Sequence, residues 1–440
     1  MRIVHAVGWY FPEALGGTEV YVAALARRLR CAGHEVLIAA PDARLETPRT
    51  YEHDGVPVYR YPVPDCPTRA EAQGLIAARG AERLHAWLTA RRPDVVHFHS
   101  FGTGLGLFEV RAAKAARARI VVTTHSSRLG FICQRGTLMR WGESLCDGVS
   151  EPAKCAACDL QHRGLPRPLA RAIGAIPPGL ARLARSAPGR WATALSMSDL
   201  IARNRAAQQE LLALVDRFVV LTRWALDAVA ANGAPAAKLA CNPLGLGQTA
   251  IARKPGPRER PTAPPVRVGY LGRFESLKGV ADLARATASL PGDVAISVEF
   301  RGPTSRAEPR CLEQTRAYVE RDRRMRMAPA VAWTEVCDVL AGYDVLCCPS
   351  RCLEGGPTVA IEAHAVGTPV IGARVGGLAE LIADGVNGRL VEPGDWRALA
   401  RVLAEIARDP ARSIDRWRAA LPRARTMDDV AADYLTIYAA

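Results

Sequence analysis

Short apolar runs alternate with stretches of helical spacing in the first part of the chain. Five runs have the length and the branched apolar content of buried strands: MRIVHAV, HEVLIAAP, VPVYRYPV, DVVHFHS and RIVVTTHS. Segments with apolar residues at helical spacing lie between them, such as residues 18–30, RGAERLHAWLTARR and AAKAARA. Buried strands that alternate with helices predict an α/β fold with a parallel, doubly wound sheet.

The same alternation restarts after residue 265 with VRVGYLGR, VAISVEFRGP, VLCCPS and PVIGARVGG. A chain of 440 residues is too long for one hydrophobic core. We therefore expect an N-terminal domain over residues 1–250 and a second doubly wound domain over 266–415. Residues 251–265, rich in proline and charge, are the predicted linker. The last segment, 416–440, contains a capped amphipathic helix that we expect to pack back on the N-terminal domain.

The alternation breaks over residues 131–205, which we interpret as an insertion in the N-terminal domain. A cysteine-rich stretch comes first, and residues 163–205 then hold eight arginines and one acid, Asp199. One interpretation is a helical cap whose apolar stripe packs on the domain. The other is a basic amphipathic surface for anionic lipid, although prolines interrupt it. We favour the cap, and the second interpretation is tested by neutralising Arg182, Arg185 and Arg190.

Overall composition is that of an ordinary globular protein, with 49% hydrophobic and 23% charged residues. The net charge of +14 suits nucleic acid, an anionic membrane or a polyanionic small substrate. No paired stacking aromatics, zinc-finger spacing or long Lys/Arg run is present, so we expect no nucleic-acid partner. No secretory signal and no run approaching ~18 apolar residues occurs, so we expect a cytoplasmic protein, at most peripheral on the inner face of the membrane.

Two loops of the second domain carry unusual residues. In GRFESLKG, Arg273 and Lys278 flank a turn that opens a helix at Gly279, which suits a diphosphate. In RCLEGGPTVAIEA, a loop with Glu354 precedes a short helix that begins near Thr358 and contains Glu362.

The residues of RCLEGGPTVAIEA suggest a nucleotide site. Gly355 and Gly356 let the backbone approach a ligand closely. Glu362 lies in a helix that is apolar on most sides, so its carboxylate needs a partner. A ribose diol is one such partner, while the helix N-terminus meets the phosphates.

In the first domain, Gly16 and Gly17 form a close-approach turn at the start of a helix. The strands that end in HFHS and TTHS bring His97, His99 and His125 to one edge of the predicted sheet. A single histidine at a strand end is more often a satisfied structural residue than a catalyst, and three at one edge shift that balance toward a site.

GRFESLKG, the two glutamates, GTPVIGARVGGLAELI, NGRLVEPGD, GGTE, PDVVHFHS and TTHS together resemble the retaining, GT-B-fold family-four glycosyltransferases (glycosyl transferases group 1). The resemblance covers nearly the whole chain outside residues 131–205. It implies two Rossmann-like domains facing a cleft, with the acceptor on the N-terminal side. It also implies a nucleotide-diphosphate sugar donor, transfer of a hexose-type sugar with retention, and no cofactor or metal for catalysis.

The resemblance also assigns roles by position. In the second domain, Arg273 and Lys278 would neutralise the diphosphate, Glu362 would hold the ribose and Glu354 would contact the sugar hydroxyls. The same donor site would include Gly355, Gly356 and Thr358. In the first domain, His125 would lie beside the transferred sugar, and Gly16 and Gly17 would border diphosphate and acceptor. Two departures are EGGP where the family usually has EGFG, and Ser126 where an Asp often follows the histidine. They leave the contacts to the donor sugar open.

We therefore expect a glycosyltransferase of cell-surface polysaccharide or glycoconjugate synthesis, with a saccharide or polyprenyl-linked acceptor and peripheral membrane contact. A non-catalytic sugar-nucleotide-binding protein and an epimerase or phosphorylase of the same fold remain alternatives. Two carboxylates also suit a glycoside hydrolase, which needs them around one glycosidic bond without a phosphate site.

Four cysteines of the insertion, Cys133, Cys146, Cys155 and Cys158, have the spacing C-x12-C-x8-C-x2-C. Four thiols in a glycine-containing loop are able to form a closed tetrahedral zinc site, which we expect to be structural. The alternative is four unligated thiols in a reducing compartment.

Overall fold

The computed structural model describes residues 1–13, 16–247 and 263–440, which fold into two compact units. Unit 1 consists of Met1–Pro243 and Met427–Ala440, and unit 2 of Leu244–Thr426. No described helix combines the length and the apolar content that a membrane crossing requires. The predicted linker, residues 251–265, lies outside the described residues except for its last three.

Unit 1 is built on an eight-stranded sheet with the order β10-β9-β6-β5-β1-β2-β4-β3. Its strands are β1 (Arg2–Ala6), β2 (Glu35–Asp42), β3 (Arg49–His53), β4 (Val56–Pro62), β5 (Val95–Phe98), β6 (Arg119–Thr123), β9 (Arg217–Val220) and β10 (Leu239–Cys241). Neighbouring strands are parallel, except that β3 pairs antiparallel with β4 at the edge. The five predicted strands of this domain are confirmed, whereas β3 was missed because its RTYEH sequence is polar and exposed.

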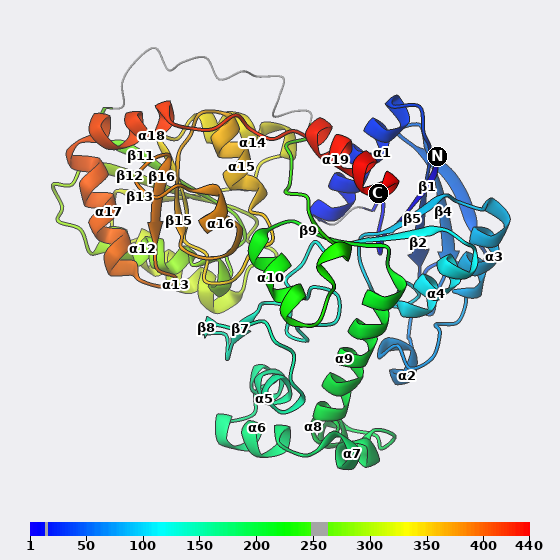
Figure 1. Cartoon of the computed structure of the whole chain (residues 1–440). Helices are drawn as coiled ribbons and strands as arrows, with labels where there is room; N and C mark the ends of the chain where they lie inside the picture. The colour runs from blue at the N-terminus through cyan, green and yellow to red at the C-terminus, as the bar shows by residue number, and fades with distance from the viewer. Residues whose placement is uncertain (14–15, 248–262) are drawn as a thin grey trace. The chain divides into compact units, whose positions relative to one another are not determined.

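The helices of unit 1 pack against this sheet and against one another (Figure 1). They are α1 (Gly17–Cys31), α2 (Arg69–Ala72), α3 (Glu82–Arg91), α4 (Leu107–Ala115), α10 (Arg223–Ala231), η2 (Ala236–Lys238) and α19 (Met427–Ala439). The C-terminal α19 packs on α1, where Arg28 Nε lies 2.6 Å from Asp428 Oδ1 and Tyr21 donates to the Tyr434 hydroxyl at 3.2 Å.

The insertion of unit 1 is a helical subdomain with a small hairpin. Its elements are β7 (Met139–Arg140), β8 (Ser144–Leu145), α5 (Pro152–His162), α6 (Arg167–Gly174), α7 (Pro178–Ala181), η1 (Arg182–Ala184), α8 (Arg190–Leu195) and α9 (Met197–Leu214). Ala156, Leu160, Ile173, Met197 and Ile201 form its own core, and α9 packs on α4. Most of the apolar residues of the insertion are therefore core residues, which agrees with the interpretation of this segment as a helical cap.

Unit 2 is built on a six-stranded parallel sheet with the order β13-β12-β11-β14-β15-β16. Its strands are β11 (Val266–Leu271), β12 (Ile296–Arg301), β13 (Met325–Ala328), β14 (Val345–Cys348), β15 (Val370–Ala373) and β16 (Gly388–Val391). Its helices are η3 (Ser276–Lys278), α12 (Val280–Ala288), α13 (Pro309–Val319), η4 (Trp333–Glu335), α14 (Val336–Ala341), α15 (Thr358–Ala365), α16 (Gly376–Leu381), α17 (Trp396–Arg408), the π-helical turn η5 (Ala411–Asp415) and α18 (Arg416–Ala419).

Both faces of the unit 2 sheet are buried. Side chains alternate between the two faces of a strand. Along β14, Val345 and Cys347 belong to a core cluster with Phe300 and Leu403, whereas Leu346 and Cys348 belong to a second cluster. Helices α12, α13 and α17 contribute to the first cluster, and α14, α15 and α16 to the second. Coverage on both faces explains why these strands are almost continuously apolar.

The boundaries of the units differ from the predicted domain boundaries. Unit 1 ends at Pro243 rather than at residue 250, because the next residues already contact unit 2: Leu246 N donates to Arg425 O at 2.9 Å. Unit 2 continues to Thr426 rather than to 415, since Trp417 of α18 is buried in its core. Of the segment 416–440, only the last helix belongs to unit 1.

Candidate functional site

The strand order of unit 2 reverses between β11 and β14, which lie side by side in the sheet. Loops that follow the two strands at such a switch point run in opposite directions and leave a crevice at the carboxyl ends of the strands, where open α/β sheets bind ligands. GRFESLKG follows β11, and the loop that contains Glu354 follows β14. Both predicted donor loops of this unit thus start at the switch point.

The structure brings Lys278 and Glu354 together across this switch point. Lys278 Nζ lies 2.8 Å from Glu354 Oε2, and both side chains are mostly buried. The other carboxylate oxygen of Glu354 accepts from the Ser350 hydroxyl, and its backbone carbonyl accepts from Gly377 N at 3.0 Å. Glu354 is therefore held in one orientation by two loops and by the start of α16.

Arg273 is placed differently from its predicted partner. Its side chain is 57% exposed and pairs with Glu275, with 2.7 Å between Nη1 and Oε1. The charges of Arg273, Glu275, Lys278 and Glu354 nevertheless act on one group, the Cys352 thiol. Burial raises the pKa of Cys352 to about 11, with Glu354 as the next cause. The structure therefore pairs Lys278 with Glu354, whereas Arg273 pairs with Glu275 at an exposed part of the loop.

The two loops are locked together behind this ion pair. Gly279 has φ 67°, and a Cβ there would lie 1.9 Å from Pro349 O, so only glycine allows this approach. Arg351 N donates to Leu277 O at 2.8 Å, and its guanidinium pairs with Asp282, with 2.6 Å between Nε and Oδ2. These contacts link the loop after β11 to the loop after β14 beside Lys278.

Helix α15 presents an uncapped N-terminus and a carboxylate without a partner. Pro357 is its N-cap and supplies no side-chain hydrogen bond, and Thr358 at the first helical position is exposed. Among the described residues, the Glu362 carboxylate makes no hydrogen bond or ion pair, and burial raises its pKa. A half-buried carboxylate in this state is suited to accept hydrogen bonds from a ligand.

Two glycines of the second predicted loop precede this helix. Gly355 and Gly356 are partly buried, and a Cβ at Gly356 would lie 2.4 Å from Leu244 Cδ1. The close packing at Gly356 is therefore against the protein's own chain in this unit.

The strand order of unit 1 reverses between β1 and β5. Gly8 N, after β1, donates to Ser100 Oγ, after β5, at 2.6 Å. Gly16 is the N-cap of α1, and its amide donates to Glu19 Oε2 at 3.1 Å. A Cβ added at Gly17 would meet no other side chain or backbone within 4 Å, so the space beside Gly17 is open. The predicted glycine turn is thus at the switch point of this unit.

The histidines of unit 1 form a hydrogen-bonded chain. His5 Nδ1 lies 2.9 Å from His99 Nε2, and His99 Nδ1 lies 3.1 Å from His125 Nε2. The ring of Tyr21, on α1, packs edge-on against His125 at 4.8 Å between centroids. His125 is partly exposed at the outer end of this chain.

His97 was predicted at the strand end but lies within β5, opposite His5. It is fully buried and its two nitrogens contact the Tyr438 and Thr123 hydroxyls, both at 2.7 Å. His97 is therefore a satisfied core residue, and only His99 and His125 continue toward the strand ends.

Burial makes these histidines neutral and links stability to pH. It lowers the pKa of His5 to about 3 and of His125 to about 4, and it lowers the pKa values of His97 and His99 well below their usual range. The unfolded chain binds protons below pH ~6.5 that the folded chain does not. Above pH ~6.5 these histidines therefore do not reduce the free energy of unfolding. Below that pH the free energy of unfolding falls by roughly 1.4 kcal/mol per histidine and pH unit, because protons bind to the unfolded chain.

Urea unfolding at several pH values tests this linkage. The slope of unfolding free energy against pH reports how many more protons the unfolded chain binds than the folded chain. In His5→Asn this number is expected to be lower by about one. His162→Gln, at an exposed residue of α5, is the matched control and is expected to leave the slope unchanged. Equal slopes for wild type and His5→Asn would show that His5 is protonated in the folded chain.

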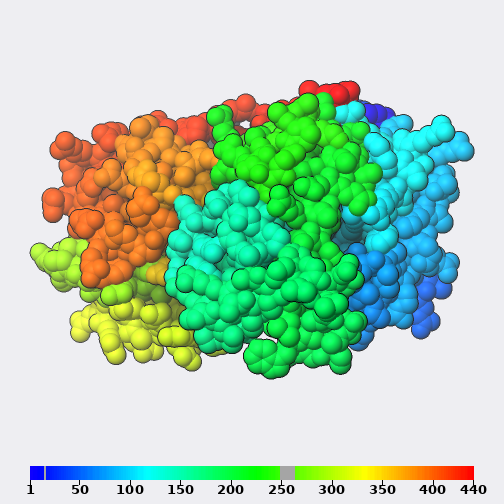
Figure 2. Space-filling model, turned by 60° about the horizontal axis from the view of Figure 1, so that its bottom comes forward, coloured from blue at the N-terminus to red at the C-terminus, as the bar shows by residue number. Residues whose placement is uncertain are grey.

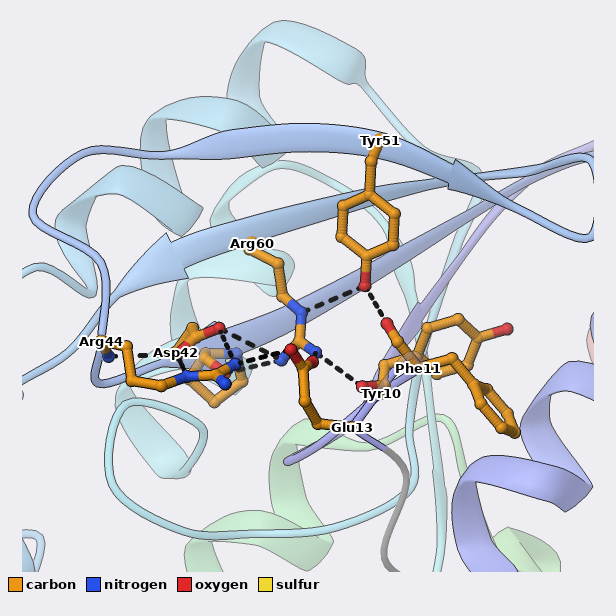
Figure 3. A network of polar contacts seen from close by, with 8 residues as sticks. Tyr10, Phe11, Glu13, Asp42, Arg44, Tyr51 and Arg60 are labelled. Carbon is orange, nitrogen blue, oxygen red and sulfur yellow. Dashed lines mark hydrogen bonds and ion pairs between the residues drawn. The ribbon is translucent and has the colours of Figure 1, made fainter.

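A buried arginine holds the loop that leads to Gly16 (Figure 3). Arg60, on β4, is 4% exposed. It donates to Tyr10 O at 2.6 Å, Pro41 O at 3.3 Å and Glu13 Oε2 at 3.1 Å. Arg44 pairs with Asp42 at 2.8 Å and lowers the pKa of that carboxyl. Figure 3 shows both guanidinium groups converging on Asp42 and Glu13.

The four cysteines predicted as zinc ligands lie in the insertion, and Cys133 and Cys146 are close enough to Cys155 to act on its thiol. Cys155 and Cys158 lie on α5, Cys133 and Cys146 in the loops before it, and all four are free thiols. Their sulfurs accept or donate local hydrogen bonds, such as Gly136 N to Cys133 Sγ at 3.3 Å. Among the described residues, only His5, His97 and His99 bring three possible ligand atoms within 4.8 Å of one another. No three of the four sulfurs come that close in the described residues, and the structural zinc site stays a prediction.

The residues that the sequence did not identify mainly hold the loops of the two switch points in place. Ser350 and Arg351 fix the Glu354 loop, and Arg60 fixes the loop before Gly16. A charged residue inside the apolar run VPVYRYPV was an available signal for Arg60. His5 also gave a signal as a polar residue inside MRIVHAV, but its contact with His99 needs the pairing of β1 with β5.

Two family models match the chain in succession. The Glycosyl transferase 4-like domain matches residues 16–245, more than half of the chain, and Glycosyl transferases group 1 matches residues 258–421. The chain is 31% identical to D-inositol 3-phosphate glycosyltransferase of Streptomyces avermitilis, over 68% of this chain and 61% of that relative. It is 27% identical to the Streptomyces coelicolor protein of the same name, over 97% and 87%. The first alignment thus spans less than two thirds of the relative.

Solved structures of similar fold include sucrose-phosphate synthase from Thermosynechococcus elongatus, at 18% identity and TM-score 0.61, covering 100% of this chain and 98% of that one. Anabaena HepE in complex with UDP-glucose matches at 14% identity and TM-score 0.60, over 99% and 100%. Identities this low show the fold alone, and they confirm the predicted GT-B fold. With both family models matched in chain order on this fold, the chain belongs to the glycosyl transferases group 1 family and is a glycosyltransferase.

Proposed function

We propose that this glycosyltransferase moves a hexose-type sugar from a nucleoside-diphosphate donor to a hydroxyl group, with retention of the anomeric configuration. One observation carries the proposal: the Lys278–Glu354 ion pair lies at the switch point of unit 2. The loop that contains Glu354 leads directly into α15, whose N-terminus is uncapped and whose Glu362 has no partner among the described residues. A cation, free helix amides and a lone carboxylate match a diphosphate joined to a ribose diol.

In the proposed reaction the bond between the sugar C1 and the diphosphate oxygen breaks, and a bond to the acceptor oxygen forms. The diphosphate oxygen takes the electron pair of the broken bond and develops negative charge, and the proton of the acceptor hydroxyl passes to that oxygen or to water. Lys278 and Arg273 neutralise this charge as it develops, which lowers the barrier more than it strengthens substrate binding. Glu354, oriented by Lys278 and Ser350, accepts hydrogen bonds from sugar hydroxyls.

The remaining predicted residues complete this proposal. Glu362 binds the ribose, and the backbone from Gly355 to Thr358 meets the donor. In unit 1, His125 contacts the transferred sugar as a neutral imidazole, and the turn at Gly16 and Gly17 borders diphosphate and acceptor. The resemblance to the family supports these roles, and the exposure of Gly17 and the partial exposure of His125 are compatible with them.

Screening sugar nucleotides by native mass spectrometry tests the donor class. UDP-sugars come first, since the similar HepE structure contains UDP-glucose. Acceptors to be tried are D-inositol 3-phosphate, which gives the Streptomyces relatives their name, saccharides, and polyprenyl-linked sugars of cell-surface synthesis. The anomeric coupling constant of the product distinguishes retention from inversion.

Incubation of a labelled sugar nucleotide separates the alternatives. A transferase gives a new glycoside only when an acceptor is present. A non-catalytic binder returns the donor intact, an epimerase changes the sugar without an acceptor, and a phosphorylase needs inorganic phosphate. Cleavage of simple glycosides without a nucleotide would favour a hydrolase and contradict the proposal.

Glu362 gives a pH-dependent prediction for donor binding. Ribose hydroxyls donate to the ionised carboxylate, so binding lowers a pKa that burial raises in the free protein. Donor binding near that raised pKa is therefore expected to release a proton, and affinity is expected to fall as the pH falls through it. Titration calorimetry in two buffers of different ionisation enthalpy measures this release.

The matched variants are Glu362→Gln and Glu313→Gln. We expect Glu362→Gln to abolish the proton release and weaken nucleotide binding by roughly 10- to 100-fold, the range for hydrogen bonds to a charged group. Glu313, exposed on α13, is expected to behave as wild type. An unchanged donor Kd for Glu362→Gln would remove the ribose role.

A further inference from the structure

The far end of the insertion exposes large apolar side chains. Leu180 on α7, Leu183 on η1 and Trp191 on α8 are 62%, 75% and 64% exposed. These elements pack against one another, and Figure 1 shows α7 and α8 at the end of the subdomain away from the eight-stranded sheet. The core of the subdomain is made by other residues, such as Ile173 and Met197. Packing within the chain therefore does not account for this apolar group.

The stretch of chain that carries these apolar side chains is rich in arginine. Residues 163–195 contain six arginines and no Asp or Glu. Four of them contact other side chains of the subdomain: Arg163 with Asp159 at 2.7 Å, Arg167 with Glu143, Arg185 with Asp199 at 3.7 Å, and Arg171 over the Trp141 ring at 5.5 Å. Arg182 and Arg190 are exposed, and their side chains have no ion pair or hydrogen bond with the described residues.

We propose that Leu180, Leu183, Trp191, Arg182 and Arg190, here called the docking face, bind the surface of a bilayer that contains anionic lipid. Aliphatic and indole side chains enter the boundary between headgroups and acyl chains, and arginines next to them pair with lipid phosphates. Figure 2 shows the insertion, cyan-green to green, at the front of the surface. The inference goes beyond the proposed reaction, because it involves none of its residues.

Charge complementarity selects the membrane over other occupants. Two exposed arginines without ion pairs to the described residues, each next to an exposed apolar side chain in a stretch of chain that contains no acid, favour an anionic surface. A nucleic acid would engage the arginines but would leave Leu180 and Leu183 in water. The structure also refines the trio named from the sequence: Arg185 pairs with the buried Asp199, so replacing it would disturb the subdomain, and only Arg182 and Arg190 are suitable for a test.

Vesicle sedimentation with the full chain tests the proposal. Wild type is expected to sediment with vesicles of phosphatidylcholine and phosphatidylglycerol in equal parts, to remain unbound with pure phosphatidylcholine, and to be released by high salt. Arg182→Gln/Arg190→Gln is expected to weaken partitioning roughly 30-fold. Leu180→Ser/Leu183→Ser/Trp191→Ser is expected to weaken it by at least roughly tenfold.

Matched controls keep the result specific. Arg401→Gln/Arg408→Gln removes the same charge from exposed residues of α17, and Trp333→Ser removes a 70% exposed indole from unit 2. Both are expected to bind vesicles as wild type. Circular dichroism checks that each variant is folded, and brominated lipid is expected to quench wild-type fluorescence more than that of Trp191→Phe.

Three outcomes would overturn the proposal. The first is a wild-type chain that does not bind the anionic vesicles. The second is a loss of binding that is equal in the docking-face variants and the controls. The third is self-association of the wild type that the docking-face variants abolish while vesicle binding stays the same, because the face would then bind a second copy of the chain.

Discussion

Lys278→Met is expected to lower kcat/KM for sugar transfer by roughly 10²- to 10³-fold, the cost of removing one preorganised group that stabilises developing charge. Lys278 is the cation that the structure fixes at the switch point of unit 2, 2.8 Å from Glu354. Without it, the leaving diphosphate loses a charge partner and Glu354 loses the group that orients it. Both losses act on the transition state, so kcat is expected to fall more than the donor affinity.

A second measurement identifies what Lys278 contacts. If it pairs with the diphosphate, Lys278→Met weakens binding of the nucleoside diphosphate and leaves binding of the nucleoside unchanged. Lys154→Met is the matched control, because Lys154 is also mostly buried and pairs with Asp147 and Glu151, both at 2.9 Å, in the insertion. We expect Lys154→Met to keep full activity. Equal losses for the two variants would indicate a general effect on the fold and contradict the assigned role.

Arg60→Met is expected to destabilise unit 1 by about 2–6 kcal/mol, because the two backbone carbonyls to which Arg60 donates lose this donor at about 1–3 kcal/mol each. The guanidinium is nearly inaccessible and donates to two backbone carbonyls as well as to Glu13. Methionine fills a similar volume but leaves these acceptors without donors. Urea unfolding measures the loss, and hydrogen exchange of residues 7–13 is expected to rise as the loop loses its anchor.

Arg44→Ala is the control for the same network. Arg44 pairs with the same two acids, Asp42 and Glu13, but its side chain is 62% exposed. Its removal is expected to change neither the unfolding free energy nor the exchange of residues 7–13 by a measurable amount, because water replaces an exposed cation. A loss for Arg44→Ala as large as that for Arg60→Met would show that charge, rather than buried hydrogen bonding, stabilises the loop.

The sequence was sufficient for the elements and for the donor loops. Buried parallel strands are almost continuously apolar, so β1, β2, β11 and β14 were recognisable without any knowledge of their neighbours. The glycine, proline and charged residues of the two loops identified the segments on either side of the unit 2 switch point. The edge strand β3 was not predicted, because its polar and exposed residues do not give the apolar pattern that identifies a strand.

Pairings between distant residues were beyond the sequence. Arg273 and Lys278 looked equivalent along the chain, and only packing of the β14 loop against η3 decides that Lys278, rather than Arg273, meets Glu354. The four cysteines have suggestive spacing, but whether their sulfurs share one metal depends on the directions that helix α5 and the loops before it give them, and among the described residues no three of these sulfurs lie within 4.8 Å of one another. Spacing constrains which residues are near in the chain, and metal binding depends on direction.

The amino-acid sequence by itself determined the α/β class, the two doubly wound halves, the insertion and the family, since these depend on periodicity and on local motifs. The tertiary structure alone decided which carboxylate is paired and which is not: Glu354 bonds to Lys278 and Ser350, whereas Glu362 has no partner among the described residues. It also decided that His97 is core while His125 remains partly exposed. The physical reason is that burial and charge pairing are set by strand order, which brings together residues far apart in the chain.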